Sequence, residues 1–226
     1  MAACGFLRLL VRLTAIMTTR ICIVRHGETD WNVEKRIQGH LDIPLNATGR
    51  AQALAMAYNA AHHRFAMIYS SDLSRALDTA RAIAEREGLE IRTLPQIRER
   101  NYGIFEGLTA AEAAVKYPEA YALYVARDPH YDFETGESML AFADRVANGI
   151  DWMVRHHAGQ TICAVCHGGV LDILYRKATG RPLHTPRDFV IPNCALNWFH
   201  FDEHGWHLEK WADRHHLEHV LLETPE

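Results

Sequence analysis

Short runs of β-branched and other apolar residues alternate along this chain with segments of helical periodicity, and this alternation limits the fold more than any other feature. Residues 21–24, 66–69 and 161–165 read as buried strands, and residues 90–94 as a further one. Helical segments separate them, which gives a β-α-β order. This order implies an α/β fold with a mostly parallel sheet that helices cover on both faces.

Four helical segments follow from apolar spacing and from end signals. Residues 48–65 are predicted to bury one face, formed by Ala51, Leu54, Ala55, Tyr58, Ala61 and Phe65. Residues 74–87 form a second helix that stops at Gly88. A capping box at residues 109–112 starts a third. Residues 138–157 form a fourth, whose buried face is expected to contain Phe142, Val146, Ile150 and Val154.

The C-terminal part reads as a β-hairpin. Residues 195–201 and 206–211 alternate in polarity around a turn at residues 202–205, and this hairpin would add antiparallel strands to the sheet. Residues 126–136, in contrast, lack helical periodicity and contain Pro129. They are a candidate lid or wall of a pocket.

Composition and charge limit the classes of function. The chain has 226 residues, of which 48% are hydrophobic, so it can bury one substantial core. We expect a single domain over residues 20–226, after an extension at residues 1–19 in which Met17 is the expected true start. Arg8 and Arg12 interrupt the apolar run of the extension, so we do not expect an export signal.

The net charge of −4 provides no basic field for nucleic acid or for an anionic membrane, and neither is an expected partner. An anionic ligand must therefore be held by a local cluster in a pocket. The exposed end of the sheet could support a homodimer.

The cysteines indicate a reducing compartment. They form an odd and sparse set in a chain too long to need disulfide bonds, which predicts a cytoplasmic location. The set consists of Cys4, Cys22, Cys163, Cys166 and Cys194. Cys163, Cys166 and His167 match the C-x-x-C-H pattern of c-type haem attachment. Residues i and i+3 of a strand point to opposite faces, however, so we expect neither haem nor zinc there, and Cys166 is interpreted as half-buried beside the pocket.

Three expected strands end in loops that contain reactive or cationic side chains. Arg25 and His26 end the first strand, residues 70–72 lead from the second to Arg75, and His167 follows the strand at residues 161–165. In parallel sheets, ligands bind beyond the carboxyl ends of the strands. These loops should therefore converge on one edge of the sheet.

The side chains in these loops fit the needs of phosphoryl transfer. That reaction needs a nucleophile in line with the leaving oxygen, cations around the equatorial oxygens and an acid for the departing alkoxide. His26 offers an imidazole nitrogen as nucleophile. Arg25 and Arg75 offer planar forks that match phosphate, and His167 is a further donor. Glu99 could donate the proton to the leaving group.

Backbone amides near the expected histidines could add partial positive charge without bulk. Gly27 follows His26, and Gly168 and Gly169 begin the helix after His167. We therefore include Gly27 and Gly168 among the expected phosphate-binding residues.

Further motifs surround these residues in a fixed order. In chain order they are Arg25-His26-Gly27-Glu28-Thr29, Trp31-Asn32, Gln38-Gly39, Asp42-Ile43-Pro44-Leu45, Thr48-Gly49, Ser70-Ser71-Asp72-Leu73 with Arg75-Ala76 and Thr79-Ala80, Arg98-Glu99, Gly103, Phe105-Glu106-Gly107, Gly136-Glu137-Ser138 and His167-Gly168-Gly169-Val170. Taken together, they resemble the phosphoglycerate mutase-like branch of the histidine phosphatase superfamily from about residue 20 to residue 215. The branch often has Ser where this chain has Cys166.

The resemblance implies a three-layer α/β/α sandwich around a mixed, mostly parallel sheet, and a reaction that needs neither metal nor cofactor. It also implies that His26 becomes phosphohistidine, and that Glu99 acts first as an acid and then as a base for water.

The resemblance assigns the binding residues as well. Arg25, Arg75 and His167 should hold the phosphoryl oxygens, Asn32 should contact the transferring group, and Gln38 should line the substrate side. The expected ligand is a small phosphorylated metabolite.

The segment at residues 108–135 favours a phosphatase over a cofactor-dependent mutase. It is short, and its only cations are Lys116 and Arg127. Its aromatic residues suit a partly apolar substrate better than a doubly anionic one; they are Tyr117, Tyr121, Tyr124, Tyr131 and Phe133. The alternatives are a cofactor-dependent phosphoglycerate mutase and a catalytically silent module that binds a phosphorylated ligand or a protein.

Three acidic residues near these motifs receive structural interpretations. Asp72 is expected to cap the helix that follows it. Glu28 and Glu106 are expected to form salt bridges within loops.

Overall fold

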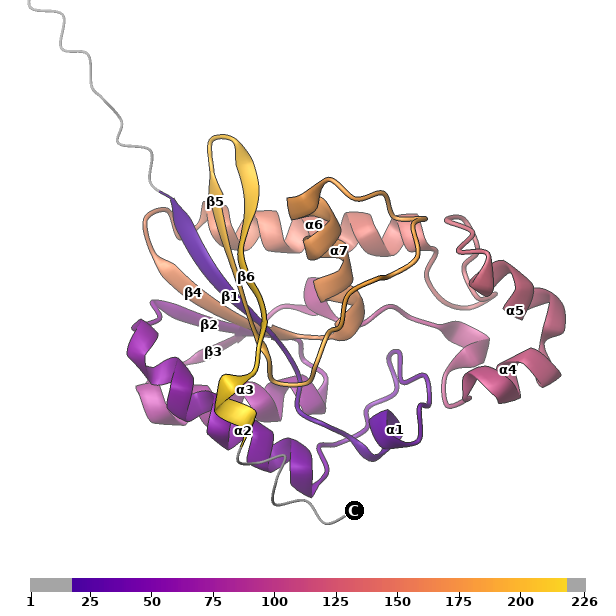
Figure 1. Cartoon of the computed structure of the whole chain (residues 1–226), viewed down its shortest axis with the longest axis horizontal. Coiled ribbons are helices and arrows are strands. Elements are labelled where there is room, and N and C mark those ends of the chain that lie inside the picture. The colour runs from indigo at the N-terminus through magenta and orange to yellow at the C-terminus, as the bar shows by residue number, and fades with distance from the viewer. Residues whose placement is uncertain (1–17, 219–226) are drawn as a thin grey trace, which may run out of the picture.

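The computed structural model describes residues 18–218 (Figure 1). The expected start at Met17 and nearly all of the extension at residues 1–19 lie outside these residues. The strands of the described part form one sheet in the order β3-β2-β4-β1-β5-β6. They are β1 (Thr19–Arg25), β2 (Met67–Ser70), β3 (Ile91–Thr93), β4 (Thr161–Cys166), β5 (Leu196–Asp202) and β6 (Gly205–Asp213).

The sheet is mixed and mostly parallel, as predicted. β1, β2, β3 and β4 run parallel to their neighbours in this group. β5 pairs antiparallel with β1, and β6 pairs antiparallel with β5. The expected hairpin therefore adds two antiparallel strands beside β1, at one edge of the sheet.

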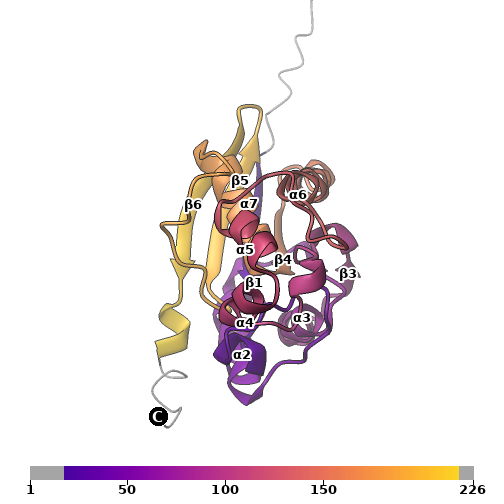
Figure 2. The ribbon, with the colours of Figure 1, turned by 90° about the vertical axis from the view of Figure 1, so that its right-hand side faces the viewer.

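Helices cover both faces of the sheet and give the predicted three layers. The α-helices are α1 (Asp30–Val33), α2 (Ala47–Ala60), α3 (Ser74–Glu87), α4 (Ala110–Lys116), α5 (Pro118–Val125), α6 (Met139–Arg155) and α7 (Gly168–Thr179). Short 3-10 turns occur at η1 (Ala61–His63), η2 (Pro95–Ile97), η3 (Gly103–Phe105) and η4 (His215–Leu217). α2 and α3 lie on one face and α6 and α7 on the other, while α4 and α5 lie beyond the strand ends (Figure 1 and Figure 2). None of the helices in residues 18–218 has the length and apolar character to cross a membrane.

The central strands are buried on both faces, which explains their continuous apolar sequence. On β1, Ile21 and Ile23 pack with the α6 and α7 side, whereas Cys22 and Val24 pack with the α2 and α3 side. All four are fully buried. An apolar run without alternation is the pattern of a parallel strand between two helical layers.

Several helix ends follow the expected chemistry. Gly88 ends α3 with a φ of 66°, a left-handed conformation that glycine adopts without strain. The capping box of Thr109 and Glu112 starts α4. Ser138 caps α6 by accepting a hydrogen bond from the Ala141 amide, and the expected apolar face of α6 is buried.

The predicted buried face of α2 is wrong. Leu54 and Tyr58 are 57% and 62% exposed, whereas the buried side of the helix is formed by Gly49, Gln52, Ala53, Met56, Ala57 and Ala60. Phe65 is buried but lies after the helix. Apolar residues occur all around α2, so their spacing does not select one face. Small side chains meet α3 and the sheet because they allow close approach.

The loops after β1, β2 and β4 converge on one edge of the sheet, as expected. The His26 amide donates to the carbonyl of Cys166 at 2.9 Å, and the Ser71 amide donates to the carbonyl of Val165 at 3.0 Å. Residues 126–136 contain no helix or strand and follow α5 beside this edge.

Candidate active site

A pocket with an empty volume of about 490 Å³ lies at this edge. It contains six of the side chains predicted from the sequence, which are Arg25, His26, Asn32, Gln38, Arg75 and Glu99. His167 lies directly behind it, with its ring centroid 5.2 Å from that of His26. Residues from four separate segments of the chain, at positions 25–38, 75, 99 and 167, thus meet in one place.

His26 is buried at the end of β1 and is held in one orientation. Its Nδ1 lies 2.7 Å from the carbonyl oxygen of Gly27. A carbonyl only accepts, so Nδ1 carries the proton and Nε2 carries the lone pair in the neutral ring. Burial, with Arg75 and Arg25 nearby, holds the pKa of His26 well below its usual value. The ring is therefore neutral at physiological pH and can act as a nucleophile.

Gly27 has a different role from the one expected. Its amide donates to Oγ1 of Thr79 at 2.9 Å, so this N–H is already used within the protein. A Cβ at Gly27 would lie 2.4 Å from the carbonyl oxygen of Gly49, which no side chain can tolerate. Gly27 thus permits close backbone packing. Thr79 belongs to the motifs of the resemblance but had no role assigned to it; it lies one helical turn after Arg75 on the same face of α3.

Arg75 is fully buried and anchored by backbone carbonyls. Its Nη1 and Nη2 donate to the carbonyls of Leu41 and Gly39, both at 2.8 Å. Burial lowers the pKa of Arg75 to about 10, so the guanidinium stays charged at neutral pH. Arg25 is anchored in the same way, because its Nη1 donates to the carbonyl of Ile191 at 2.8 Å. Burial also lowers the pKa of Arg25.

His167 precedes the first turn of α7 and is fully buried. Burial, with Arg75 and His26 as the next causes, holds its pKa well below the usual value, so this ring is neutral as well. Gly168 is the first residue of α7, where the amide of a helix has no partner within the helix. No hydrogen bond of this amide occurs within residues 18–218. The Gly168 amide is therefore available for an anion, in contrast to that of Gly27.

Glu99 is fixed by two backbone amides. Its Oε1 accepts from the Arg100 amide at 2.8 Å, and its Oε2 accepts from the Gly169 amide at 3.1 Å. A Cβ at Gly169 would lie 2.2 Å from Oε1 of Glu99, so a glycine is needed for this approach. The carboxylate is thereby held beside the start of α7, at the wall of the pocket.

Asn32 belongs to the capping box of α1, where its Oδ1 accepts from the Thr29 amide at 3.1 Å. Asn193, which the sequence analysis missed, reaches the same place: its Nδ2 donates to the carbonyl of His26 at 2.7 Å and lies 3.4 Å from Oδ1 of Asn32. Asn193 therefore joins the loop after α7 to the loop after β1.

Unpaired buried polar atoms are concentrated at this site. In the described residues, nine buried side-chain nitrogen or oxygen atoms have no hydrogen-bond partner, and five of the nine belong to residues of the site. These five are Nε of Arg25, Oε1 of Gln38, Nε of Arg75, and Nδ1 and Nε2 of His167. Folded proteins pair nearly all buried polar groups. The cluster therefore indicates a polar ligand, and the two buried guanidinium groups indicate an anion.

The acidic residues around the pocket differ from expectation. Asp72 does not cap α3; its carboxylate forms a salt bridge with Arg98, and Oδ1 of Asp42 accepts from the Ser74 amide at 2.7 Å instead. The salt bridges expected for two glutamates are wrong as well. Within residues 18–218, Glu28 accepts from Nδ2 of Asn46 at 3.0 Å, and Glu106 accepts only backbone amides.

A second pocket, with an empty volume of about 590 Å³, adjoins the first and shares Tyr102 and Tyr124 with it. Three arginines line it, namely Arg100, Arg127 and Arg187, together with Asp128 and Asp172. Asp172 forms salt bridges with Arg127 at 3.8 Å and with Arg187 at 3.1 Å, so the carboxylates offset part of the arginine charge. Of the three arginines, only Arg127 comes from residues 108–135, so two of these cations were not included when that segment was considered alone. Several aromatic residues of the segment instead pack around Phe105, and these are Tyr117, Tyr121, Tyr124 and Phe133.

Cys163 and Cys166 lie on opposite faces of the sheet, as the strand argument predicted. Both are fully buried and carry free thiols. The interpretation of Cys166 as half-buried is therefore wrong. The C-x-x-C-H pattern does not form a common ligand site.

Comparisons with known proteins agree with this arrangement. Residues 21–214 match the family model of the histidine phosphatase superfamily (branch 1). The phosphoglycerate mutase-like protein 4 of Arabidopsis thaliana is 40% identical over 202 residues, which cover 88% of this chain and 86% of that protein. A metal-independent phosphoserine phosphatase of the same plant is 36% identical over 205 residues, which cover 89% of this chain and 84% of that protein.

The solved structure of a mycobacterial glucosyl-3-phosphoglycerate phosphatase in complex with VO3 superimposes with a TM-score of 0.77 at 31% identity, and covers 86% of this chain and 99% of that one. Relatives with named phosphatase activity thus occur both among similar sequences and among similar structures. The chain belongs to branch 1 of the histidine phosphatase superfamily.

Proposed function

We propose that this protein hydrolyses small phosphomonoesters through a phosphohistidine at Nε2 of His26. The observation that carries this proposal is the cluster of unpaired buried donors on Arg25, Arg75 and His167 beside a neutral imidazole. Two guanidinium groups and a neutral ring match a phosphoryl group, which needs donors around its oxygens and a nucleophile in line.

The reaction proceeds in two steps. Nε2 of His26 attacks phosphorus, the bond from phosphorus to the ester oxygen breaks, and Glu99 gives its proton to the departing alkoxide. Glu99, now a carboxylate, removes a proton from water, whose oxygen attacks phosphorus while the P–N bond breaks. Inorganic phosphate leaves, and both His26 and Glu99 return to their starting states.

Positive charge at the site comes from the protein alone in this mechanism. Arg25 and Arg75 stabilise the phosphoryl oxygens, while His167 and the Gly168 amide add neutral donors. Asn32 contacts the same group, and no metal ion or cofactor takes part. The name of one relative, a metal-independent phosphoserine phosphatase, supports this proposal.

The substrate class follows from the second pocket. Arg100, Arg127 and Arg187 lie next to the proposed reaction centre, where Tyr102 and Tyr124 join the two pockets. Nε of Arg187 donates to Asp172 at 3.1 Å, and a carboxylate on the substrate would pair with the Nη atoms of the same guanidinium. We therefore propose a phosphomonoester with a carboxylate, in place of the partly apolar substrate that the aromatic residues first suggested. Phosphoserine and glucosyl-3-phosphoglycerate, which the names of two relatives contain, are such compounds.

A phosphoglycerate mutase is the second candidate, favoured by the three arginines of the second pocket and by the name of the relative phosphoglycerate mutase-like protein 4. Both reactions should be followed on one preparation by NMR, with and without 2,3-bisphosphoglycerate. We expect phosphate release to exceed isomerisation. Isomerisation that the bisphosphate stimulates and that outpaces hydrolysis of every tested ester would favour the mutase.

The nucleophile is tested by trapping the phosphoenzyme with labelled substrate and rapid quenching. A phosphoramidate resists alkali and is lost in acid, in contrast to an acyl phosphate. We expect trapping in the wild type and none in His26→Ala. The variant His40→Gln serves as a control, since its ring lies near the site with Nε2 2.9 Å from the carbonyl of Glu99. Wild-type trapping in His26→Ala would show that another residue is the nucleophile.

We further propose that residues 20–226 form one domain that acts in the cytoplasm. Four free buried thiols in the described residues support a reducing location. A homodimer stays a prediction, which light scattering on the purified protein would test.

A further inference from the structure

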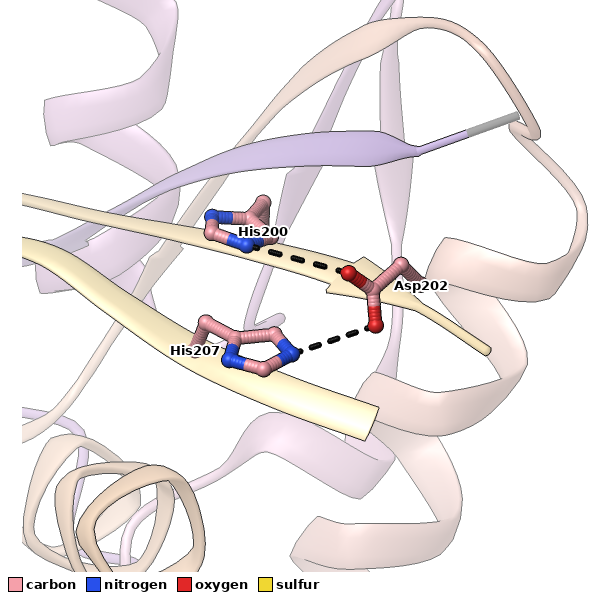
Figure 3. A group of neighbouring side chains, drawn as sticks. All are labelled: His200, Asp202 and His207. Carbon is pink, nitrogen blue, oxygen red and sulfur yellow. Dashed lines mark hydrogen bonds and ion pairs between the residues drawn. The ribbon is translucent and has the colours of Figure 1, made fainter. Parts of the chain in front are cut away.

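A second cluster of potential ligand groups lies on the β5–β6 hairpin, away from the proposed active site. His200 and Asp202 are two residues apart on β5, so they share one face of the strand. His207 on β6 is the register partner of His200. One ligand atom of each residue lies within 4.8 Å of those of the other two. The three side chains face one another across the hairpin (Figure 3).

His200 is held in the tautomer that a metal requires. Its Nδ1 lies 3.2 Å from Oε1 of Glu209, and Oε2 of Glu209 accepts from Nε of Arg20 at 2.7 Å. A carboxylate only accepts, so Nδ1 carries the proton and Nε2 keeps its lone pair. Nε2 lies 4.0 Å from Oδ2 of Asp202. A carboxylate behind a histidine is the usual support for a metal-binding imidazole.

His207 completes the set. Its Nε2 lies 3.1 Å from Oδ1 of Asp202, and its ring stacks on that of His200 with centroids 4.6 Å apart and planes 16° apart. In the absence of metal, Nε2 of His207 donates its proton to Asp202. A metal ion would take the place of that proton, which would move to Nδ1 or be released to water.

We propose that His200, Asp202 and His207 bind a divalent transition-metal ion of the Zn²⁺ class. Two imidazole nitrogens and one carboxylate oxygen suit Zn²⁺, Ni²⁺ or Cu²⁺, whereas Mg²⁺ and Ca²⁺ prefer oxygen ligands alone. Three protein ligands leave one coordination position for water. Glu209, fixed by Arg20, is the positioning residue for His200.

The site is structural rather than catalytic. His200 pairs with Arg20 near the start of β1, whereas His26 follows the end of that strand. His26 lies six positions after Arg20 along the chain, or about 20 Å in extended backbone. The ion would cross-link β5 to β6 at the edge of the sheet. This inference is independent of the proposed phosphatase activity.

Metal binding is measured on the full chain after EDTA treatment and removal of the chelator, by Zn²⁺ titration in competition with a chromophoric indicator. We expect one tight site per chain. Asp202→Asn and His207→Asn should weaken it at least 10-fold, and Glu209→Gln should weaken it about 10-fold or more. The matched control is His204→Asn. The imidazole of His204 lies in the turn of the same hairpin, beside Glu203 and outside the cluster. It should change the affinity less than twofold.

Thermal unfolding gives a second readout. Zn²⁺ at about 100 times its Kd should raise Tm of the wild type by roughly 5–11 °C, and Tm of Asp202→Asn by at most about half as much. Tm of each variant in EDTA shows whether it is folded. Equal Zn²⁺ affinity in the wild type and in folded Asp202→Asn and His207→Asn would overturn the proposal, because the histidines elsewhere would then account for all binding.

Discussion

Replacement of Glu99 by glutamine tests the proposed acid most directly. Both carboxylate oxygens of Glu99 accept from backbone amides, those of Arg100 and Gly169. Glutamine keeps one acceptor oxygen, but its NH₂ group must face one of the two amides. The variant therefore loses the proton that the leaving group needs, and it also loses one charge-assisted hydrogen bond.

The loss of the acid lowers the reaction rate, whereas the loss of the hydrogen bond lowers the stability of the fold. A positioned general acid contributes about 10²–10⁴ in rate, or about 2.7–5.5 kcal/mol of transition-state stabilisation. The lost hydrogen bond costs about 1.5–3 kcal/mol of folding stability. At about 2–4 °C per kcal/mol for a chain of this size, Tm should fall by roughly 3–12 °C. The structural loss affects all substrates alike, whereas the loss of the acid depends on the leaving group.

The assay compares kcat/KM for an alkyl phosphate and for p-nitrophenyl phosphate in wild type and Glu99→Gln. We expect the full loss with the alkyl ester and a much smaller loss with the nitrophenyl ester, whose leaving group needs no proton. Glu106→Gln is the control for removal of a negative charge near Arg75. Oε1 of Glu106 accepts hydrogen bonds from the backbone amides of His40 and Tyr102, and glutamine keeps an oxygen that can accept both. Equal losses for the two esters in Glu99→Gln would refute the acid role.

Three further predictions concern the same site. The pKa values of His26 and His167 are lowered, so neither ring should become protonated as the pH falls to about 6.5. NMR titration of the two rings measures this. Protonation at about pH 6.5 would contradict the proposed nucleophile. The unfolded chain then binds more protons than the folded one, so Tm should fall as the pH drops below about 6.5. Hydrolysis should survive EDTA, and a complete loss that one divalent ion restores would reject the mechanism. Thr79→Val leaves the buried Gly27 amide unpaired and should lower Tm by about 2–12 °C, at about 1–3 kcal/mol, whereas Thr79→Ser keeps the hydroxyl and should lower it less.

The sequence predicted the sheet and the site because both depend on local patterns. The apolar runs of β1 and β4 identify buried strands without knowledge of the fold. Arg25 ends β1, His26 follows it, and His167 follows β4, so parallel pairing alone brings these three together. Asn32, Gln38, Arg75 and Glu99 line the same pocket, and they were expected there from the motifs of the family resemblance.

Contacts between segments far apart in the chain were not predictable in this way. The partner of Asp72 is Arg98, 26 residues later, and α3 is capped by Asp42, 32 residues before Ser74. Neither spacing corresponds to a turn or to a helix. A capping rule considers only adjacent residues, and it therefore assigned Asp72 to the nearest helix.

The arginines of the second pocket illustrate the same limit. Arg100 follows Glu99, Arg127 follows α5, and Arg187 lies in the loop after α7. Each reads as an ordinary surface charge in its own segment. Only the packing of these segments around Tyr102 brings the three arginines into one pocket, together with Asp172, and this is why we propose a substrate with a carboxylate.

In the proposed mechanism, two fixed arginines take the place of a metal ion. A metal supplies concentrated positive charge at a fixed point, whereas an arginine on the surface is mobile and loses side-chain entropy when it is held in one place. Arg75 and Arg25 overcome this difference because the carbonyls of Leu41, Gly39 and Ile191 hold their Nη atoms before any substrate arrives. Their Nε atoms have no partner in the described residues, so binding of a phosphoryl group needs little rearrangement. Fixed donors in a buried site stabilise developing charge more than mobile ones do, since their orientation is established when the chain folds.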